Sequence, residues 1–516
     1  MFDDGSSPAM ILQKMQLGSV TTPAQSTGHR RAAAAAAAVL WLAALAGCGE
    51  GGPDGRSADP STGAGSPART ATAPGADAAP AAPTLKSDPR ACPAGFACST
   101  LRVDLDRAGR ADGADGRLGL RVAVQRSDRP AKGYLVYLTG GPGQPGLPAA
   151  TRVLQRLGPV IAGYGLVLLD QRGTGAGALA CPRLQRSVGS SDIAVAARGS
   201  VEACARQVGA RRATFTTADT VSDLEDLRRA LGATRLTLVG VSYGTFVAEQ
   251  YALAHPGRVR ALVLDSVVDQ RGADALLLRN MAAVPRVLRA VCRDERCPGD
   301  VAADLRAALA FGADDVALLD TLVGLSIGDP SLEEVPPALR AAARGRLDGL
   351  ERLAGEVREA ASDVPAREFS AGLHAATLCA ESDVPWTDAT ALPADREQGL
   401  AQARAQLTPG RLGGFEPKTA VENGLADTCR RWPPLDKAPP VQTGSLPAVP
   451  TLLLAGELDL ATPLEDAREQ LERSPRGRLV VLPGMGHSVL SADPSGCALR
   501  VTGRFLAGRA AGSCRG

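Results

Sequence analysis

Two pentapeptides place a serine between glycines in the pattern G-x-S-x-G, which is typical of a nucleophilic serine at a sharp strand-to-helix turn. They are GVSYG at Gly240–Gly244 and GLSIG at Gly324–Gly328. Because the chain holds 58 glycines in 516 residues, the pattern alone is weak and its surroundings must decide. Ser242 follows a strand-like apolar run and precedes a helical segment, whereas Ser326 follows a helical run and precedes Asp329-Pro330. We therefore predict Ser242 as the nucleophile of an acyl-transfer reaction and keep Ser326 as the disfavoured alternative.

A serine hydroxyl becomes a useful nucleophile when a base takes its proton, and histidine is the usual base because its pKa lies near working pH. The chain has four histidines. His29 lies in the N-terminal leader, His255 ends the helix after the serine, and His374 lies in a helical region as a packed or surface residue. His487 stands in a loop directly after the last strand-like run, so we predict it as the general base, with a structural role as the alternative.

The acid that orients the imidazole should stand between the serine and the histidine in the chain. The segment AGELD, which follows the next-to-last strand-like run, offers Glu457 and Asp459. Asp459 lies further into the loop and is followed by Thr462-Pro463, which begins a helical segment. We predict Asp459 as the acid and keep Glu457 as the alternative.

Acyl transfer also requires N–H donors for the oxyanion that develops on the carbonyl. One donor should be the amide of Tyr243, directly after the predicted nucleophile. The second should come from the glycine-rich loop TGGPG at Thr139–Gly143, which follows a strand-like run. Glycines allow a backbone to approach a substrate closely, and an ordinary turn is the alternative reading of this loop.

Eight short apolar runs supply the strands that must position these loops. They lie at 101–105, 118–124, 134–138, 165–169, 235–239, 261–264, 451–454 and 479–482. The middle runs are apolar throughout, as expected of strands covered on both faces. Helical segments at 220–231, 245–255 and 464–473 alternate with the later runs. This alternation predicts an α/β fold, with a mostly parallel eight-stranded sheet and helices on both faces.

The alternation stops between residues 272 and 441, which are rich in Ala, Leu and Arg. Helical spacing is clear there at 303–309 and 339–361. We expect a helical cap at 272–441, inserted between a first core part at 91–271 and a C-terminal core part at 442–516.

The N-terminal segment has the composition of an export leader. His29-Arg30-Arg31 precede the apolar run Ala32–Ala46, which is shorter than the roughly 20 residues that span a membrane. The run ends in LAGC, which resembles the bacterial lipoprotein cleavage box. We expect residues 1–47 to be a lipoprotein signal peptide and Cys48 to be lipidated, with an ordinary signal peptide as the alternative. The chain is then exported and either lipid-anchored in a bacterial cell envelope or secreted.

Residues 48–90 are Gly, Pro, Ala, Ser, Thr and Asp with hardly a large apolar residue, which predicts a flexible tether. Beyond Cys48 the chain has ten cysteines, an even number that suggests disulfides in an exported protein. Pairing each cysteine with a neighbour along the sequence gives Cys92–Cys98, Cys181–Cys204, Cys292–Cys297, Cys379–Cys429 and Cys497–Cys514.

Composition argues against several classes of protein. The formal net charge is only +2, aromatic residues make up 3% of the chain, and no dense block of Lys or Arg is present. A nucleic-acid partner is therefore not expected. No group of Cys and His has the spacing of a zinc site, and we expect neither a metal nor a cofactor.

Several motifs resemble those of the proline iminopeptidase and tripeptidyl aminopeptidase family, over roughly Cys92–Cys514. They are GGPG at 140–143, DQRGTG at 170–175, SYG at 242–244, CRRWP at 429–433 and the stretch carrying the predicted acid and base. Thr139 replaces the family's usual His, which is more similar to the tripeptidyl branch, and Ala176-Gly177 depart from the usual Arg-Ser. The resemblance implies an α/β-hydrolase fold with Gly141 as the second oxyanion donor, and loops braced by Asp170 and Arg172.

In this family an acidic cap residue binds the free α-amino group of the substrate. Glu381 and Asp383 are the candidates here, with solvated surface carboxylates as the alternative. The resemblance implies a serine exopeptidase that releases short peptides from free N-termini. A carboxylesterase with the same triad is the second hypothesis, and a non-catalytic surface protein is the third.

Overall fold

The computed structural model describes residues 83–514 apart from 108, 110–115, 128–129, 294–296, 329–331 and 363. The predicted signal peptide, most of the predicted tether and Cys48 lie outside the described residues. The end of the tether lies inside them, and its Leu85–Ser87 form a short strand, β1. Ordered backbone thus begins before Ala91, because β1 gains the hydrogen bonds of an edge strand although its side chains stay largely exposed.

A sheet of nine strands in the described residues positions the predicted site. Its order is β1-β2-β3-β5-β4-β6-β7-β8-β9, and every pairing from β5-β4 onward is parallel. The eight strands after β1 are β2 (Phe96–Asp104), β3 (Arg117–Gln125), β4 (Tyr134–Leu138), β5 (Gly165–Leu169), β6 (Leu236–Val241), β7 (Val259–Asp265), β8 (Thr451–Gly456) and β9 (Gly477–Leu482). Each corresponds to one predicted apolar run, so the predicted fold is confirmed.

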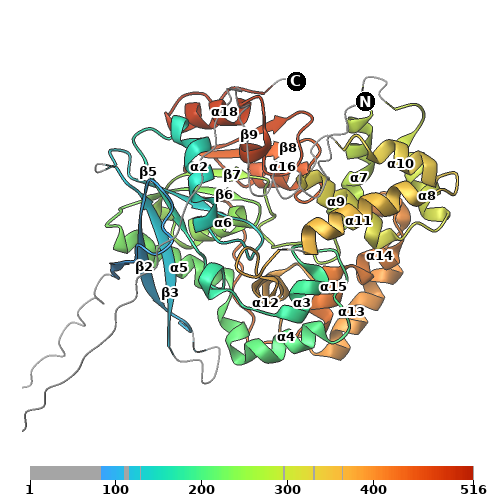
Figure 1. The fold of residues 1–516 in the computed structure, drawn as a ribbon, viewed down its shortest axis with the longest axis horizontal. Coiled ribbons are helices and arrows are strands. Elements are labelled where there is room, and N and C mark those ends of the chain that lie inside the picture. Colours follow the sequence, from blue (N-terminus) through green and yellow to red (C-terminus); the bar gives the residue numbers. More distant parts are fainter. Residues whose placement is uncertain are drawn as a thin grey trace, which may run out of the picture. The chain divides into compact units, whose positions relative to one another are not determined.

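Helices cover both faces of the sheet (Figure 1). One face packs against α2 (Ala150–Leu157), α17 (Val489–Ala492) and α18 (Cys497–Leu506). The other packs against α5 (Thr217–Ala230), α6 (Tyr243–Ala254) and α16 (Leu464–Glu472). The central strands are therefore buried from both sides, which explains why they are apolar at every position.

Helices α7 to α15 lie between β7 and β8 in the chain, where the sequence predicts the cap. They are α7 (Leu278–Val291), α8 (Val301–Ala310), α9 (Asp315–Gly328), α10 (Val335–Ala342), α11 (Asp348–Ser362), α12 (Ala371–Glu381), α13 (Pro393–Gln406), α14 (Pro417–Glu422) and α15 (Gly424–Arg431). The helical segment predicted at 339–361 is two helices, because the chain turns between them through Gly345 at a φ of +81°.

The cap has a second contribution that the sequence did not predict. Helices α3 (Pro182–Val188) and α4 (Ser200–Val208) lie between β5 and β6 in the chain, yet they share a buried apolar cluster with α12 and α15. Figure 1 shows these four helices side by side below the sheet. The cap is therefore built from two separate stretches of sequence.

All five predicted disulfides are present, and the pairing by sequence neighbours is confirmed. Cys181–Cys204 joins α3 to α4, and Cys379–Cys429 joins α12 to α15. Disulfides in this number are typical of proteins exported to an oxidising compartment.

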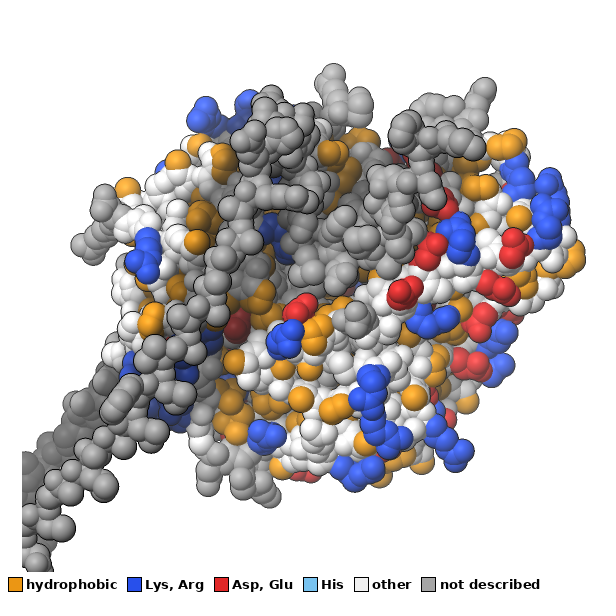
Figure 2. Space-filling view, viewed as in Figure 1, with side chains coloured by type: hydrophobic (Ala, Val, Ile, Leu, Met, Phe, Trp, Pro, Cys, Tyr) orange, Lys and Arg blue, Asp and Glu red, His pale blue; other side chains and the backbone are white. Residues whose placement is uncertain are grey.

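Over α8 to α11, at the right of Figure 2, basic and acidic side chains are interspersed. Within the ranges that the structure describes, no helix has both the length and the apolar character needed to cross a bilayer.

Candidate active site

The turn between β6 and α6 holds Ser242 in the backbone conformation expected of a nucleophile elbow. Ser242 has a φ of 55° and a ψ of −127°, a backbone conformation that costs free energy for a non-glycine residue. A Cβ at Gly240 would lie 2.3 Å from the carbonyl oxygen of Gly244, and a Cβ at Gly244 would lie 2.3 Å from that of Leu138. Both flanking positions therefore require glycine, which is the physical basis of the pentapeptide pattern.

The predicted base and acid lie together. Nδ1 of His487 is 2.9 Å from Oδ2 of Asp459, and both side chains are buried. The second carboxylate oxygen, Oδ1, accepts hydrogen bonds from the amides of Ala461 and Thr462. The Thr462 hydroxyl donates to Oδ2 of Asp459 and lies 3.3 Å from Nδ1 of His487. With Nδ1 held by the acid, Nε2 is the nitrogen left to take up a proton.

Asp265, at the end of β7, joins the serine and histidine loops. Its carbonyl oxygen accepts a hydrogen bond from the amide of Ser242, at 2.9 Å. Its carboxylate accepts from the amides of Val489 and Leu490, directly after the loop of His487. Sequence reasoning missed this residue, although a carboxyl group that closes an apolar strand was a visible signal.

Electrostatics in this region favour a charged imidazole. Burial lowers the pKa of His487, but the carboxylate of Asp459, together with those of Asp265 and Asp192, raises it, so that the pKa lies above its ordinary value. Burial raises the pKa of Asp265 from 3.8 to about 6, and the hydrogen bonds from Leu490 and Val489 oppose that rise.

The glycine-rich loop after β4 lies against the nucleophile. A Cβ at Gly140 would lie 3.0 Å from Cβ of Ser242, and Gly141 has a φ of +106° that favours glycine. Tyr243 is the first residue of α6, where an amide has no acceptor within its own helix. The structure thus pairs the predicted acid with the predicted base and places the glycine-rich loop against Ser242, while Asp265 links the backbone of Ser242 to the segment after His487.

Comparison with family models agrees with this geometry. Residues 134–289 match the model of the alpha/beta hydrolase fold, and residues 418–510 match the model of TAP-like proteins. The chain has the α/β-hydrolase fold and is a hydrolase.

Among curated relatives, serine protease Hip1 of Mycobacterium tuberculosis is 27% identical over 83% of this hydrolase and 88% of the relative. Tripeptidyl aminopeptidase of Streptomyces lividans is 32% identical over 33% of this chain and 35% of the relative. Among solved structures, an epoxide hydrolase from an endophytic Streptomyces matches 81% of this chain and 96% of its own at 17% identity, with a TM-score of 0.35.

The DQRGTG segment of the hydrolase is fixed by an ion pair and a hydrogen bond of two buried side chains. Arg172 is buried and forms a two-pronged ion pair with Asp223, with N–O distances of 2.8 and 2.7 Å. Oδ1 of Asp170 accepts a hydrogen bond from the amide of Leu147, at 2.9 Å. Both residues tie a loop after β5 to other segments, as the family resemblance implies.

Ser326, the alternative serine, lies inside helix α9 rather than at a strand-to-helix turn. It is fully buried, and its carbonyl oxygen accepts a hydrogen bond from the amide of His487, at 2.9 Å. Its hydroxyl accepts from the amide of Leu460 at 3.2 Å and donates to the carbonyl of Val323. The cap helix α9 therefore ends on the loops that carry the predicted base and acid.

Glu457, the alternative acid, has partners other than the imidazole. Its carboxylate pairs with Arg293 and accepts a hydrogen bond from the amide of Gly484. It thus serves to connect the loops after β8 and β9 to the cap helix α7 and its end.

Glu381 and Asp383, predicted to bind an α-amino group, have different surroundings. Glu381 is buried, and its carboxylate accepts hydrogen bonds from both the amide and the hydroxyl of Thr217. The Tyr243 hydroxyl lies 2.7 Å from the same Thr217 hydroxyl, so this carboxylate supports the nucleophile elbow from the cap side.

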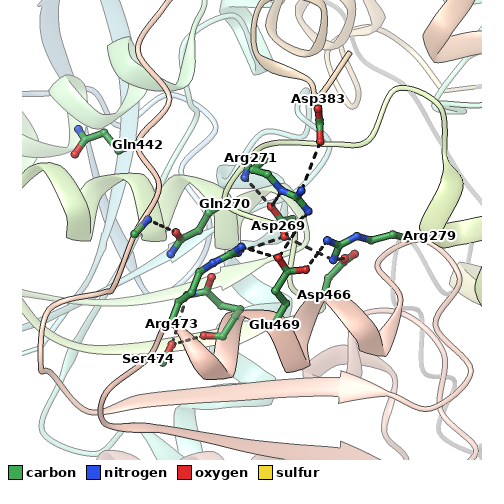
Figure 3. Close-up of polar contacts among 12 residues, drawn as sticks. Asp269, Gln270, Arg271, Arg279, Asp383, Gln442, Asp466, Glu469, Arg473 and Ser474 are labelled. Carbon is green, nitrogen blue, oxygen red and sulfur yellow. Dashed lines mark hydrogen bonds and ion pairs between the residues drawn. The ribbon is translucent and has the colours of Figure 1, made fainter. Parts of the chain in front are cut away.

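Asp383 is half exposed and belongs to an ion-pair network at the base of the cap (Figure 3). Its carboxylate faces Arg271, at 4.0 Å, and Arg271 also pairs with Asp269. The other charged members of the network are Arg279, Asp466, Glu469 and Arg473. The network joins the segment after β7 to α7 and α16.

Asp192 and His374 form a pair that contacts the glycine-rich loop; the sequence did not single out Asp192, and it predicted His374 as a packed or surface residue. Asp192 lies between α3 and α4, its side chain is 48% exposed, and its charge helps raise the pKa of His487. Nε2 of His374 lies 2.6 Å from Oδ1 of Asp192, and Nδ1 lies 2.8 Å from the carbonyl oxygen of Pro142. No local pattern marks them, because 182 positions of sequence separate the two side chains.

Proposed function

We propose that this hydrolase is a serine exopeptidase that releases short peptides from free N-termini, with Ser242 as nucleophile. The observation that carries the proposal is the Asp459–His487 pair. Its loops follow the carboxyl ends of β8 and β9, and the strained serine turn follows the carboxyl end of β6 in the same parallel sheet. The named relatives, a serine protease and a tripeptidyl aminopeptidase, support peptide hydrolysis.

In the proposed mechanism the Ser242 hydroxyl attacks the scissile carbonyl while His487 takes its proton. The amides of Gly141 and Tyr243 stabilise the negative charge that develops on the carbonyl oxygen. The imidazolium then gives its proton to the leaving amine, and Asp459 stabilises its positive charge. A water molecule, deprotonated by the same imidazole, hydrolyses the acyl-enzyme and restores the serine.

A free α-amino group is a cation at neutral pH, so its binding site should offer a carboxylate near the reacting atoms. Each of the three carboxylates has a partner: Glu381 has Thr217, Asp383 has Arg271, and Asp192 has His374. Glu381 is also buried. Asp192 is half exposed, and its charge acts on the predicted base. We therefore assign the α-amino group to Asp192 in place of the two candidates from sequence.

The proposed setting is a bacterial cell envelope, with Cys48 as the lipid-bearing residue. The disulfides support export. Metabolic labelling with a clickable fatty acid, followed by comparison with Cys48→Ser, tests the anchor, and label that persists in the variant refutes it.

The activity is tested with three substrates on protein lacking residues 1–48: a tripeptide amide, its N-acetylated form and a short acyl ester. We expect cleavage of the free tripeptide amide, a kcat/KM at least roughly tenfold lower after acetylation, and no turnover by Ser242→Ala. Ester turnover without peptide turnover refutes the peptidase and supports the carboxylesterase. A wild-type protein that a fluorophosphonate does not label refutes the catalytic serine.

A further inference from the structure

Helix α12 is the part of the cap that contacts the glycine-rich loop. Its N-cap residue Ser370 donates its amide to the carbonyl oxygen of Gly143, at 3.1 Å. Gly143 has a φ of +129°, and a Cβ there would lie 3.0 Å from the carbonyl oxygen of Ser370. The cavity beside this contact, lined by both segments and by Tyr243, measures only about 10 Å³. Loop and helix therefore fit closely, with space for at most about one water molecule.

His374, one turn into α12, makes a second contact with the same loop. Its ring is buried and Nδ1 lies 2.8 Å from the carbonyl oxygen of Pro142, so Nδ1 must carry a hydrogen. Nε2 lies 2.6 Å from the carboxylate of Asp192, in an ion pair without the alignment of a hydrogen bond. Both nitrogens thus face oxygen atoms, and only the imidazolium presents a hydrogen to each.

The surroundings of the ring favour this charged form. Burial lowers the pKa of His374, but the Asp192 carboxylate and the contact with Pro142 raise it by more, so that the pKa lies above the ordinary value. Asp192 is the charged group that acts on this ring among the described residues. Two other titratable groups face Asp192 in turn, namely Asp320 of α9 and the predicted base His487.

We propose that protonated His374 is a positioning residue that fixes the Pro142 carbonyl and thereby holds the oxyanion loop against the cap. This inference rests on the proposed function, because it takes the loop to be the oxyanion loop. Together with Ser370, the histidine holds two consecutive carbonyl groups, those of Pro142 and Gly143, directly after the predicted donor Gly141. When the ring loses its proton, one nitrogen lone pair must face either Pro142 or Asp192, and one of the two contacts becomes repulsive.

Two neutral substitutions separate the two contacts. The amide nitrogen of Asn occupies the place of Nδ1, so His374→Asn keeps a donor for Pro142 and releases Asp192. The amide nitrogen of Gln occupies the place of Nε2, so His374→Gln keeps the contact with Asp192 and loses the donor for Pro142. His255→Gln is the matched control, because His255 lies at the far end of α6 against Tyr251.

The assay measures kcat and KM against pH with an N-acetylated amino-acid ester, which has no amine to titrate or to bind Asp192. We expect His374→Gln to lower kcat by roughly tenfold with KM within about threefold, a fraction of the effect of losing an oxyanion donor. We expect His374→Asn to keep more than about a third of kcat and to lack the alkaline decline of the wild type, because an amide does not titrate.

Equal kcat values for the Asn and Gln variants, or an alkaline decline that persists in His374→Asn, overturn the proposal. If either variant folds poorly, as judged by its unfolding midpoint and by fluorophosphonate labelling, Asp192→Asn replaces it. Removing that charge lowers the pKa of His374, so the alkaline decline should move to lower pH, and an unmoved decline overturns the proposal. An unlabelled wild type, or a fully active Ser242→Ala, instead refutes the proposed function.

Discussion

Asp265 allows a quantitative test of how a buried carboxyl group at the end of β7 affects stability. Its carboxyl group is fully buried at the end of β7, and burial raises its pKa from 3.8 to about 6. The folded state therefore binds this proton more tightly than the unfolded state does. Between pH 4 and pH 6 the unfolded chain has lost the proton and the folded chain has kept it, so this residue makes stability fall as pH rises.

The rise in the pKa of Asp265 corresponds to about 3 kcal/mol of folding free energy, measured from a pH well below both pKa values to a pH well above them. Asp265→Asn does not titrate and keeps one acceptor oxygen for the amides of Val489 and Leu490. Its free energy of unfolding, relative to that of the wild type, should therefore improve by about 2 kcal/mol between pH 4 and pH 7, since part of the change falls below pH 4. Loss of one hydrogen bond lowers the variant's stability by a constant amount at all pH values, so the pH-dependent change remains measurable.

The assay is denaturant unfolding of both proteins across this pH range with disulfides intact, evaluated as the difference between them. Taking the difference removes the carboxylates that titrate equally in both proteins. A difference that stays constant within about 0.5 kcal/mol from pH 4 to pH 7 refutes the reasoning, because it means that Asp265 titrates alike in the folded and unfolded states.

Three further outcomes are expected from the site. Asp459→Asn should lower kcat by about 10⁴-fold, whereas Glu457→Gln should stay within about twofold of the wild type, and comparable losses in both would contradict the assignment of the acid. Because the pKa of His487 is raised, kcat/KM should increase with pH through a midpoint above the ordinary 6.5, which a pH profile measures; a midpoint below 6.5 would contradict the electrostatic argument. Ser326→Ala should lose about 1–3 kcal/mol of stability yet still react with a fluorophosphonate, whereas Ser242→Ala should fold normally and not react.

The sheet was predictable because its signal is local. Each core strand is a short apolar run, and burial on both faces leaves few alternatives for such a segment. The disulfides were predictable for a similar reason, since four of the five join cysteines fewer than 25 residues apart. The break at Gly345 and the short strand β1 were missed because each depends on a single local feature, one turn or one edge pairing. The composition of the surrounding residues does not reveal such a feature.

The contacts around the site were less predictable because they join distant segments. His374 was a solitary histidine in sequence, and only the packing of α12 on the glycine-rich loop brings it to Pro142. Ser326 matched the wrong pattern, yet its helix delivers it to the amide of His487. Asp192 lay in a segment assigned to the core, and it reaches the site because α3 and α4 pack with the cap helices.

These contacts give the cap a part in the catalytic frame as well as in covering the site. It touches the base loop through Ser326, the glycine-rich loop through His374, and the nucleophile elbow through Glu381 and Thr217. A cap that only limited access would contact the rim of the site and leave each of these loops to the core. The base loop and the glycine-rich loop are hydrogen-bonded to cap helices, and the elbow is linked to Glu381 through Thr217. A displacement of the cap therefore changes the positions of the predicted base and the predicted oxyanion donors together. Substitutions at cap contacts should therefore lower kcat more than they raise KM, which is the opposite of what a simple lid predicts.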